Sequence, residues 1–126
     1  MNPTHLPRPL RIALYALAVT ILLYLCLAPQ DDIPHVNVWD KVEHTLGWLV
    51  LTVSGLMLSN NRPRTIAAFA FGVGVFVEIA QATMDLGRDG DVADLVADAL
   101  GIGIALLGYV AYVTAARRFR AVRDAA

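Results

Sequence analysis

The sequence predicts an all-α polytopic membrane protein with four transmembrane helices. Of its 126 residues, 57% are hydrophobic, and two long runs, residues 12–30 and 99–116, contain no charged side chain. A helix needs roughly 20 apolar residues to cross a hydrocarbon core about 30 Å thick, and both runs approach or reach that length. The charged residues are confined to short patches between the apolar runs, as expected where a bilayer excludes charge.

Each of the four helices is predicted from its own segment. The first covers residues 11–28 and the fourth covers residues 92–113, and these contain most of the two uncharged runs. The second and third, residues 40–59 and 65–84, have shorter uncharged stretches, so each includes ionisable residues at one end. The Asn-Asn-Arg-Pro turn at 60–63 joins them as an antiparallel hairpin, because Asn and Pro favour turns.

The charges are separated by sign along the chain. Ten of the eleven Asp and Glu residues fall within 31–43 and 78–98. Eight of the ten Lys and Arg residues lie in the two chain ends and the turn at 60–63 or beside it: Arg8, Arg11, Arg62, Arg64, Arg117, Arg118, Arg120 and Arg123. Because basic residues beside membrane spans are retained in the cytoplasm, we expect a multi-pass protein of the cell membrane with both termini cytoplasmic and the acidic loops outside.

The chain is expected to form a single membrane domain, residues 1–126, without a repeat or a linker. Its one cysteine, Cys26, excludes an intrachain disulfide and is interpreted as a small packing residue. The first apolar stretch follows Arg8 and Arg11, as in a signal peptide, but it exceeds the usual length of about 7–15 residues. We therefore interpret it as an uncleaved first helix.

Polar side chains recur at helical spacing on three of the predicted helices. They occur at positions 40 and 44, at 78, 81 and 85, and at 91, 94 and 98, and residues three or four apart share one face of a helix. At about 1.5 Å per residue, the helices carry Glu78, His44 and Asp98 roughly 21 to 28 Å from the arginine-rich boundary. Because charge facing lipid is costly, we expect them to converge on a water-accessible cavity, with Lys41 and Arg88 as counter-charges. The predicted ligand-binding residues are Asp40, Lys41, His44, Glu78, Gln81, Arg88, Asp94 and Asp98.

The order and spacing of these residues carry a family resemblance. They read Asp40-Lys41-x-x-His44, Glu78-x-x-Gln81, Arg88 and Asp94-x-x-x-Asp98-x-x-Gly101. This set resembles the signature of the VanZ-like family of small membrane proteins over about residues 40–108. The resemblance implies the membrane architecture and the polar site. The family takes its name from a member associated with teicoplanin resistance, so the resemblance also implies a contribution to glycopeptide resistance.

The chain departs from the family pattern at two places. Asp98 stands where the family usually has Asn, and a Tyr is common near the position of Trp48. The additional carboxylate of Asp98 is expected to change the charge of the site and its preference for a ligand or a metal.

Three functions are compatible with these residues. A binding site in the outer leaflet would hold a lipid-linked or glycan headgroup or an amphipathic antibiotic, since carboxylates accept hydrogen bonds from hydroxyl groups and apolar helices accommodate an acyl chain. An intramembrane enzyme would use His44 with Glu78 or Asp98 as a general base, or a metal held by these residues, on a lipid-linked substrate. A structural cluster would pair the charges with one another. The chain has no HExxH or GxSxG motif. The sequence alone does not decide between an enzyme and a binding protein, and it specifies neither a metal nor another cofactor.

The lipid bilayer is the expected partner of most of the surface. The arginine cluster at 117–123 suits anionic lipid headgroups, and it is too short and too poor in aromatic residues to predict a nucleic-acid site. Ala97, Gly101 and Ala105 recur at four-residue spacing, which lets helix backbones approach closely. Helices can pack closely in this way within one chain or between two copies of the chain, so the sequence is compatible with a homo-oligomer.

Overall fold

The computed structural model describes residues 5–28, 37–59, 62–84 and 90–125. Almost all of these residues are helical, and none of them is in a strand, so the predicted all-α class is confirmed. The helices are α1 (Arg8–Leu27), α2 (Asn37–Leu58), α3 (Pro63–Thr83) and α4 (Val92–Asp124).

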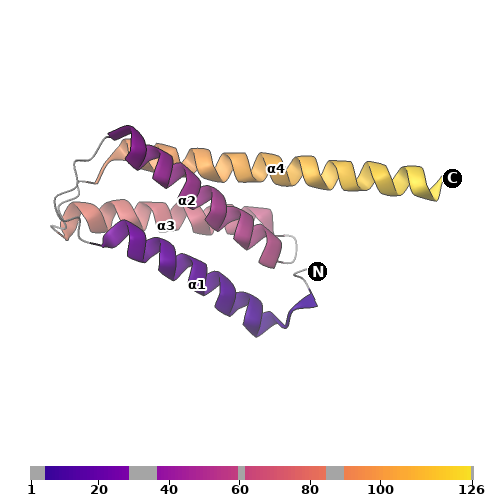
Figure 1. The fold of residues 1–126 in the computed structure, drawn as a ribbon, viewed down its shortest axis with the longest axis horizontal. Coiled ribbons are helices and arrows are strands. Elements are labelled where there is room, and N and C mark those ends of the chain that lie inside the picture. The colour runs from indigo at the N-terminus through magenta and orange to yellow at the C-terminus, as the bar shows by residue number, and fades with distance from the viewer. Residues whose placement is uncertain (1–4, 29–36, 60–61, 85–89, 126) are drawn as a thin grey trace.

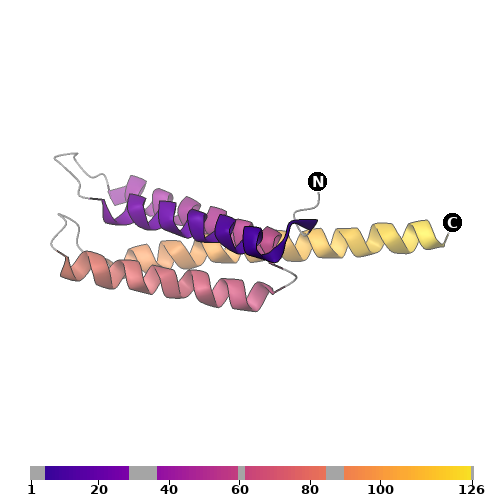
Figure 2. The same ribbon diagram turned by 90° about the horizontal axis from the view of Figure 1, so that it is seen from below.

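The four helices pack side by side in two layers, with α1 and α2 in one layer and α3 and α4 in the other (Figures 1 and 2). The starts of α1 and α3 and the end of α2 lie together at one end of the bundle (Figure 1). The opposite end holds the ends of α1 and α3 and the starts of α2 and α4. The arginines of the first end are therefore separated from the carboxylates of the second by nearly the length of the bundle.

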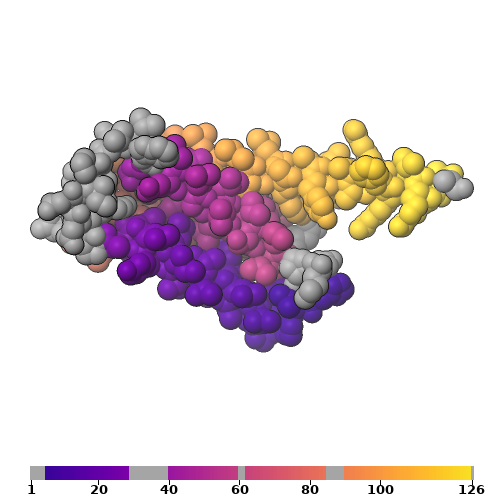
Figure 3. Space-filling view, in the orientation of Figure 1, coloured from indigo at the N-terminus to yellow at the C-terminus, as the bar shows by residue number. Residues whose placement is uncertain are grey.

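The observed helices agree with the four predicted segments except at the end of α4. The predicted span stopped at residue 113, but the helix continues to Asp124. Residues 114–124 consist mainly of Ala and Arg, which are strong helix formers, so the helix extends beyond the apolar run. This C-terminal part stands clear of the other helices (Figure 3). The predicted turn at 60–63 includes residues 60 and 61, which lie outside the described residues.

Three of the helices, α1, α3 and α4, are long and apolar enough to cross a membrane. The helix α2 is less apolar, because residues 40–44 include four ionisable side chains. Large apolar side chains cover the outside of the bundle: Ile21 is 51% exposed, Phe76 55% and Leu107 72%. Such an apolar surface is expected of a bundle that contacts lipid instead of water.

The most extensive helix pair is α2 with α4. The small residues Ala97, Gly101 and Ala105 of α4 are all buried. A Cβ atom at Gly101 would collide with the carbonyl oxygen of Thr45 and would lie 2.9 Å from the backbone nitrogen of Leu49. The hydroxyl of Thr45 also donates to the carbonyl of Ala97 at 3.2 Å. The absence of a side chain at Gly101 thus sets how closely α2 and α4 approach.

Replacement of this glycine is expected to separate the two helices. Gly101→Ala should lower the free energy of unfolding by about 1–3 kcal/mol, the usual cost of forcing an extra carbon into a packed contact. Gly103→Ala is the matched control, because nothing lies within 4 Å of a Cβ there and Ala favours the helix. Thermal unfolding in detergent measures both, and equal unfolding temperatures for the two variants would contradict the role of Gly101.

Candidate functional site

The carboxylate-rich end of the bundle contains a buried pair between α2 and α4. Nδ1 of His44 lies 2.8 Å from Oδ1 of Asp98, and the two side chains are 3% and 0% exposed. Where Asp98 is ionised, its carboxylate only accepts hydrogen bonds, and Nδ1 of His44 is then the donor of this contact. Nε2 of a neutral imidazole then keeps a lone pair for a ligand. The structure therefore brings together two of the predicted site residues, from helices far apart in the sequence.

Trp48 and Gly74 hold this pair in position. The indole of Trp48 stacks on the imidazole of His44, with ring centroids 5.4 Å apart and planes inclined by 4°. Its Nε1 donates to the carbonyl of Ala70 at 2.8 Å, which ties α2 to α3. A Cβ atom at Gly74 would lie 2.6 Å from Oδ2 of Asp98 and 3.2 Å from Nε1 of Trp48. The glycine thus provides the space that both side chains occupy.

Lys41 joins α2 to the start of α4 at the edge of the site. Its ammonium donates to Oδ2 of Asp91 at 2.9 Å and to Oδ1 of Asp94 at 2.7 Å. Asp91 is the N-cap of α4, because its Oδ1 accepts from the backbone N–H of Ala93 at 2.8 Å. This backbone N–H and then the Lys41 ammonium lower the pKa of Asp91 below its usual value. Lys41 therefore compensates the buried Asp94 and the capping carboxylate together.

Glu78 brings α3 into the cluster. Its Oε2 accepts from the backbone N–H of Asp91 at 2.7 Å. Its Oε1 is buried and has no hydrogen-bond partner among the described residues, and the same holds for Nε2 of His44 and Oδ2 of Asp98. Buried polar atoms are nearly always paired, so three unpaired atoms on three converging helices mark this cluster as a candidate site.

The cluster has the composition of a divalent-cation site. His44, Glu78 and Asp98 each offer a ligand atom within 4.8 Å of the others, and so do Asp40, His44 and Asp94. Imidazole with carboxylates suits Zn²⁺ or Mn²⁺. The same groups can also move a proton or accept hydrogen bonds from hydroxyl and ammonium groups.

The site is more closed than the sequence predicted. His44, Asp94 and Asp98 are buried, where an open cavity was expected, and the exposed part is a rim at Lys41 and Asp91, whose side chains are 36% and 50% exposed. The small residues at the helix contacts let α2, α3 and α4 close over the carboxylates.

Of the other predicted residues, Gln81 lies apart from the cluster and Arg88 lies outside the described residues. Gln81 is buried, and its Nε2 donates to the carbonyl of Cys26 at 2.9 Å. This hydrogen bond joins α3 to α1, so the amide nitrogen of Gln81 is not turned to His44. Arg88, the expected counter-charge, lies outside the described residues. Asp40 is half-buried in the first turns of α2.

The predicted site did not include Trp48 and Gly74, and Asp91 was predicted on the polar stripe of the fourth helix but not among the ligand-binding residues. Trp48 follows His44 by four residues, and Gly74 precedes Glu78 by four, so the same spacing rule places them on the polar faces. Asp91 carries a capping signal, because Asp is favoured directly before the first turn of a helix. The prediction selected charged and polar side chains. It therefore passed over Trp48, which is mainly apolar, and Gly74, which has no side chain.

Comparison of the chain with models of known families, with characterised proteins and with solved structures finds no match. The resemblance to the VanZ-like family therefore remains a prediction from the spacing of the polar residues.

Removal of the Lys41 ammonium should destabilise the start of α4. Lys41→Gln leaves the buried carboxylate of Asp94 without its cation. We expect the free energy of unfolding in detergent to fall by about 1–3 kcal/mol. Solvent screening reduces this effect, because Lys41 is partly exposed. Glu43→Gln, an exposed position on the same helix, should change little.

The effect of Lys41→Gln should also depend on pH. The lowered pKa of Asp91 means that its contribution to stability is present above the unfolded-state pKa of about 4 and is lost as the pH falls through the folded-state value. The difference in unfolding temperature between wild type and Lys41→Gln should therefore narrow below about pH 4. A difference that stays constant down to low pH would show that the ion pairs do not contribute.

Proposed function

We propose that this chain is a four-span protein of the cell membrane that binds a polar headgroup at the His44–Glu78–Asp98 cluster. The ligand is a lipid-linked or glycan headgroup of the cell envelope, or an amphipathic antibiotic. The termini are cytoplasmic and the cluster lies in the outer leaflet. The observation that carries the proposal is the set of three buried unpaired atoms, one on each of α2, α3 and α4.

The unpaired atoms argue for a ligand because they are costly. Each buried polar group without a partner costs about 1–3 kcal/mol, and a ligand that supplies donors to Glu78 and Asp98 removes that cost. A purely structural cluster accounts for part of the site, since Lys41 pairs with Asp91 and Asp94 and His44 pairs with Asp98. It does not account for Glu78, which forms no salt bridge among the described residues.

The orientation of α2 supports the proposal that α2 also crosses the membrane, in addition to α1, α3 and α4. His44 is buried and the Lys41 ammonium contacts α4, so the polar face of α2 is turned into the bundle. The opposite face presents Leu46, Val50 and Met57, which are 53%, 62% and 55% exposed. A helix with its polar groups shielded in this way exposes an apolar surface to lipid despite its lower overall hydropathy.

The chemistry of the rim supports a headgroup as ligand. Asp40 and Glu78 are half-buried beside the partly exposed Lys41 and Asp91. Carboxylates accept hydrogen bonds from hydroxyl and ammonium groups, and a lysine ammonium donates to phosphate or carbonyl oxygens. A headgroup at the rim would leave its lipid tail on the apolar outside of the bundle. By the VanZ-like resemblance, the protein contributes to glycopeptide resistance of the teicoplanin type.

Glu78→Gln separates a ligand site from a structural ion-pair cluster. The amide oxygen of Gln can still accept from the backbone N–H of Asp91, so the unfolding temperature without ligand should stay unchanged or rise. Mass spectrometry of lipid extracts should find a ligand that co-purifies with wild type and is strongly reduced in Glu78→Gln, with exposed Glu43→Gln as the control. Marked destabilisation of Glu78→Gln with an unchanged lipid content would instead indicate an ion-pair cluster.

A second candidate function is metal-assisted acid–base catalysis on a lipid-linked substrate. The observation that favours it is the approach of ligand atoms from His44, Glu78 and Asp98 within 4.8 Å. A metal bound there would activate water or polarise a phosphoryl or ester oxygen. His44, Glu78 and Asp98 would each supply one ligand atom to it.

Metal binding is tested on the same protein. Zn²⁺ or Mn²⁺ added after treatment with a chelator should raise the unfolding temperature of wild type, by an amount that grows with metal concentration. Glu78→Gln should weaken this response about tenfold or more in apparent metal affinity. Equal responses of wild type and Glu78→Gln would exclude a metal at this cluster.

A further inference from the structure

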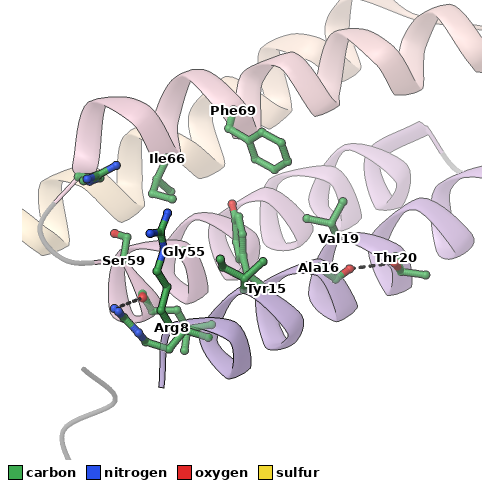
Figure 4. A pocket seen from close by; sticks show the side chains of 13 residues that line it. Arg8, Tyr15, Ala16, Val19, Thr20, Gly55, Ser59, Ile66 and Phe69 are labelled. Atoms are coloured by element: carbon green, nitrogen blue, oxygen red, sulfur yellow. Dashed lines mark hydrogen bonds between the residues drawn. The ribbon is translucent and has the colours of Figure 1, made fainter. Parts of the chain in front are cut away.

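A second cavity lies at the opposite, arginine-rich end of the bundle. It has a volume of about 670 Å³, is partly open to the outside and is lined by α1, α2 and the start of α3 (Figure 4). This volume falls within the range of about 300–1,000 Å³ that is usual for small-molecule sites. The cavity shares no residue with the His44–Glu78–Asp98 cluster, so it is a separate site.

The entrance of the cavity is positively charged. Arg8, Arg11 and Arg62 line it, and none of its described lining residues is Asp or Glu. Arg8 and Arg62 are exposed, and Arg11 is half-buried with its NH1 donating to the carbonyl of Leu58 at 2.9 Å. That hydrogen bond satisfies a carbonyl at the C-terminus of α2. The N-termini of α1 and α3 also lie at this end and add partial positive charge.

The wall of the cavity becomes apolar away from the arginines. Along α1 the lining runs from Arg8 to Thr20, and α3 contributes Ile66 and Phe69. Twelve residues of helix extend about 18 Å. One leaflet is about 15 Å thick, half of a hydrocarbon core of about 30 Å. The groove is therefore long enough to follow an acyl chain through a single leaflet.

Two buried hydroxyl groups stand between the charged and the apolar parts. The Tyr15 hydroxyl and Oγ of Ser59 have no hydrogen-bond partner among the described residues. The Tyr15 ring points between the helices, 5.8 Å from the ring of Phe69 and against Gly55, where a Cβ would lie 3.0 Å from it (Figure 4). Tyr15 is one turn beyond Arg11, about 6 Å further along the groove.

We propose that this cavity binds one anionic phospholipid from the leaflet at the arginine-rich end. Its phosphate lies between Arg8 and Arg62, where arginine forks match phosphate oxygens. The Tyr15 hydroxyl donates to an ester oxygen, and an acyl chain follows the groove to Thr20. A free phosphate would contact only the entrance and would leave the apolar groove empty, which is why a lipid fits this site better.

The test uses the full chain in a neutral detergent, titrated with phosphatidylglycerol, phosphatidylcholine or inorganic phosphate. Phosphatidylglycerol should raise the unfolding temperature, and the other two should not. In the double variant Arg8→Gln, Arg62→Gln the apparent affinity for phosphatidylglycerol should fall about tenfold or more, as expected for the loss of a charged hydrogen bond. The control is Arg117→Gln, Arg120→Gln, which removes the same charge from exposed positions of α4 that do not line the cavity.

A variant without charge change tests the groove separately. Ala16 lines the cavity and is exposed, so Ala16→Phe should fill the groove and weaken phosphatidylglycerol binding while the arginines remain. This variant decides the matter if the arginine variant is less stable without lipid. Equal stabilisation by phosphatidylcholine, an equal loss in the α4 control, or full stabilisation by inorganic phosphate would each overturn the proposal.

Discussion

The packing of α2 against α4, the most extensive helix pair of the bundle, is organised around the buried contact between His44 and Asp98. Transferring an ionised carboxylate out of water costs several kcal/mol unless a partner compensates it, and Asp98 is fully buried. The pair therefore favours one register of α2 against α4. Gly101 lets the two helices come close enough for the contact, and Thr45 closes the interface beside it. In that register Lys41 reaches Asp91 and Asp94, and Glu78 of α3 reaches the start of α4.

Opposite charges gather at opposite ends of the bundle, and the helix termini explain why this arrangement is stable. At the arginine-rich end Arg11 satisfies a carbonyl at the C-terminus of α2. At the other end Asp91 satisfies an N–H at the N-terminus of α4. Each charge thus complements the partial charge of the terminus that it contacts. The two candidate sites differ in charge for the same reason. The His44–Glu78–Asp98 cluster offers carboxylate and imidazole groups, and the cavity at the other end offers arginine side chains beside an apolar groove.

The candidate site was predicted only in part, and the residues show why. The spacing of three and four residues placed His44, Glu78, Asp94 and Asp98 on the inward faces of their helices, because an ionisable group that faces lipid is costly. The same rule selected Gln81, whose amide instead donates to Cys26 of α1. Gln81 lies about one turn of α3 after Glu78 and only approximately on the same face. This difference is enough for the Gln81 side chain to reach a different neighbour. No charge pattern pointed to the cavity between α1 and α3, since its polar groups come from three separate segments.

The sequence by itself determined the all-α class, the order of the helices and the face of each that carries polar groups. These are local properties: the length of an apolar run, the period of the helix and the position of charge relative to both. The tertiary structure decided that His44 pairs with Asp98, that Lys41 pairs with Asp91 and Asp94, and that Trp48 stacks on His44. A hydrogen bond needs its atoms about 3 Å apart, and that distance depends on how the helices rotate and cross. Close approach at Gly74 and Gly101 sets these angles, and it becomes visible only when the helices are packed together.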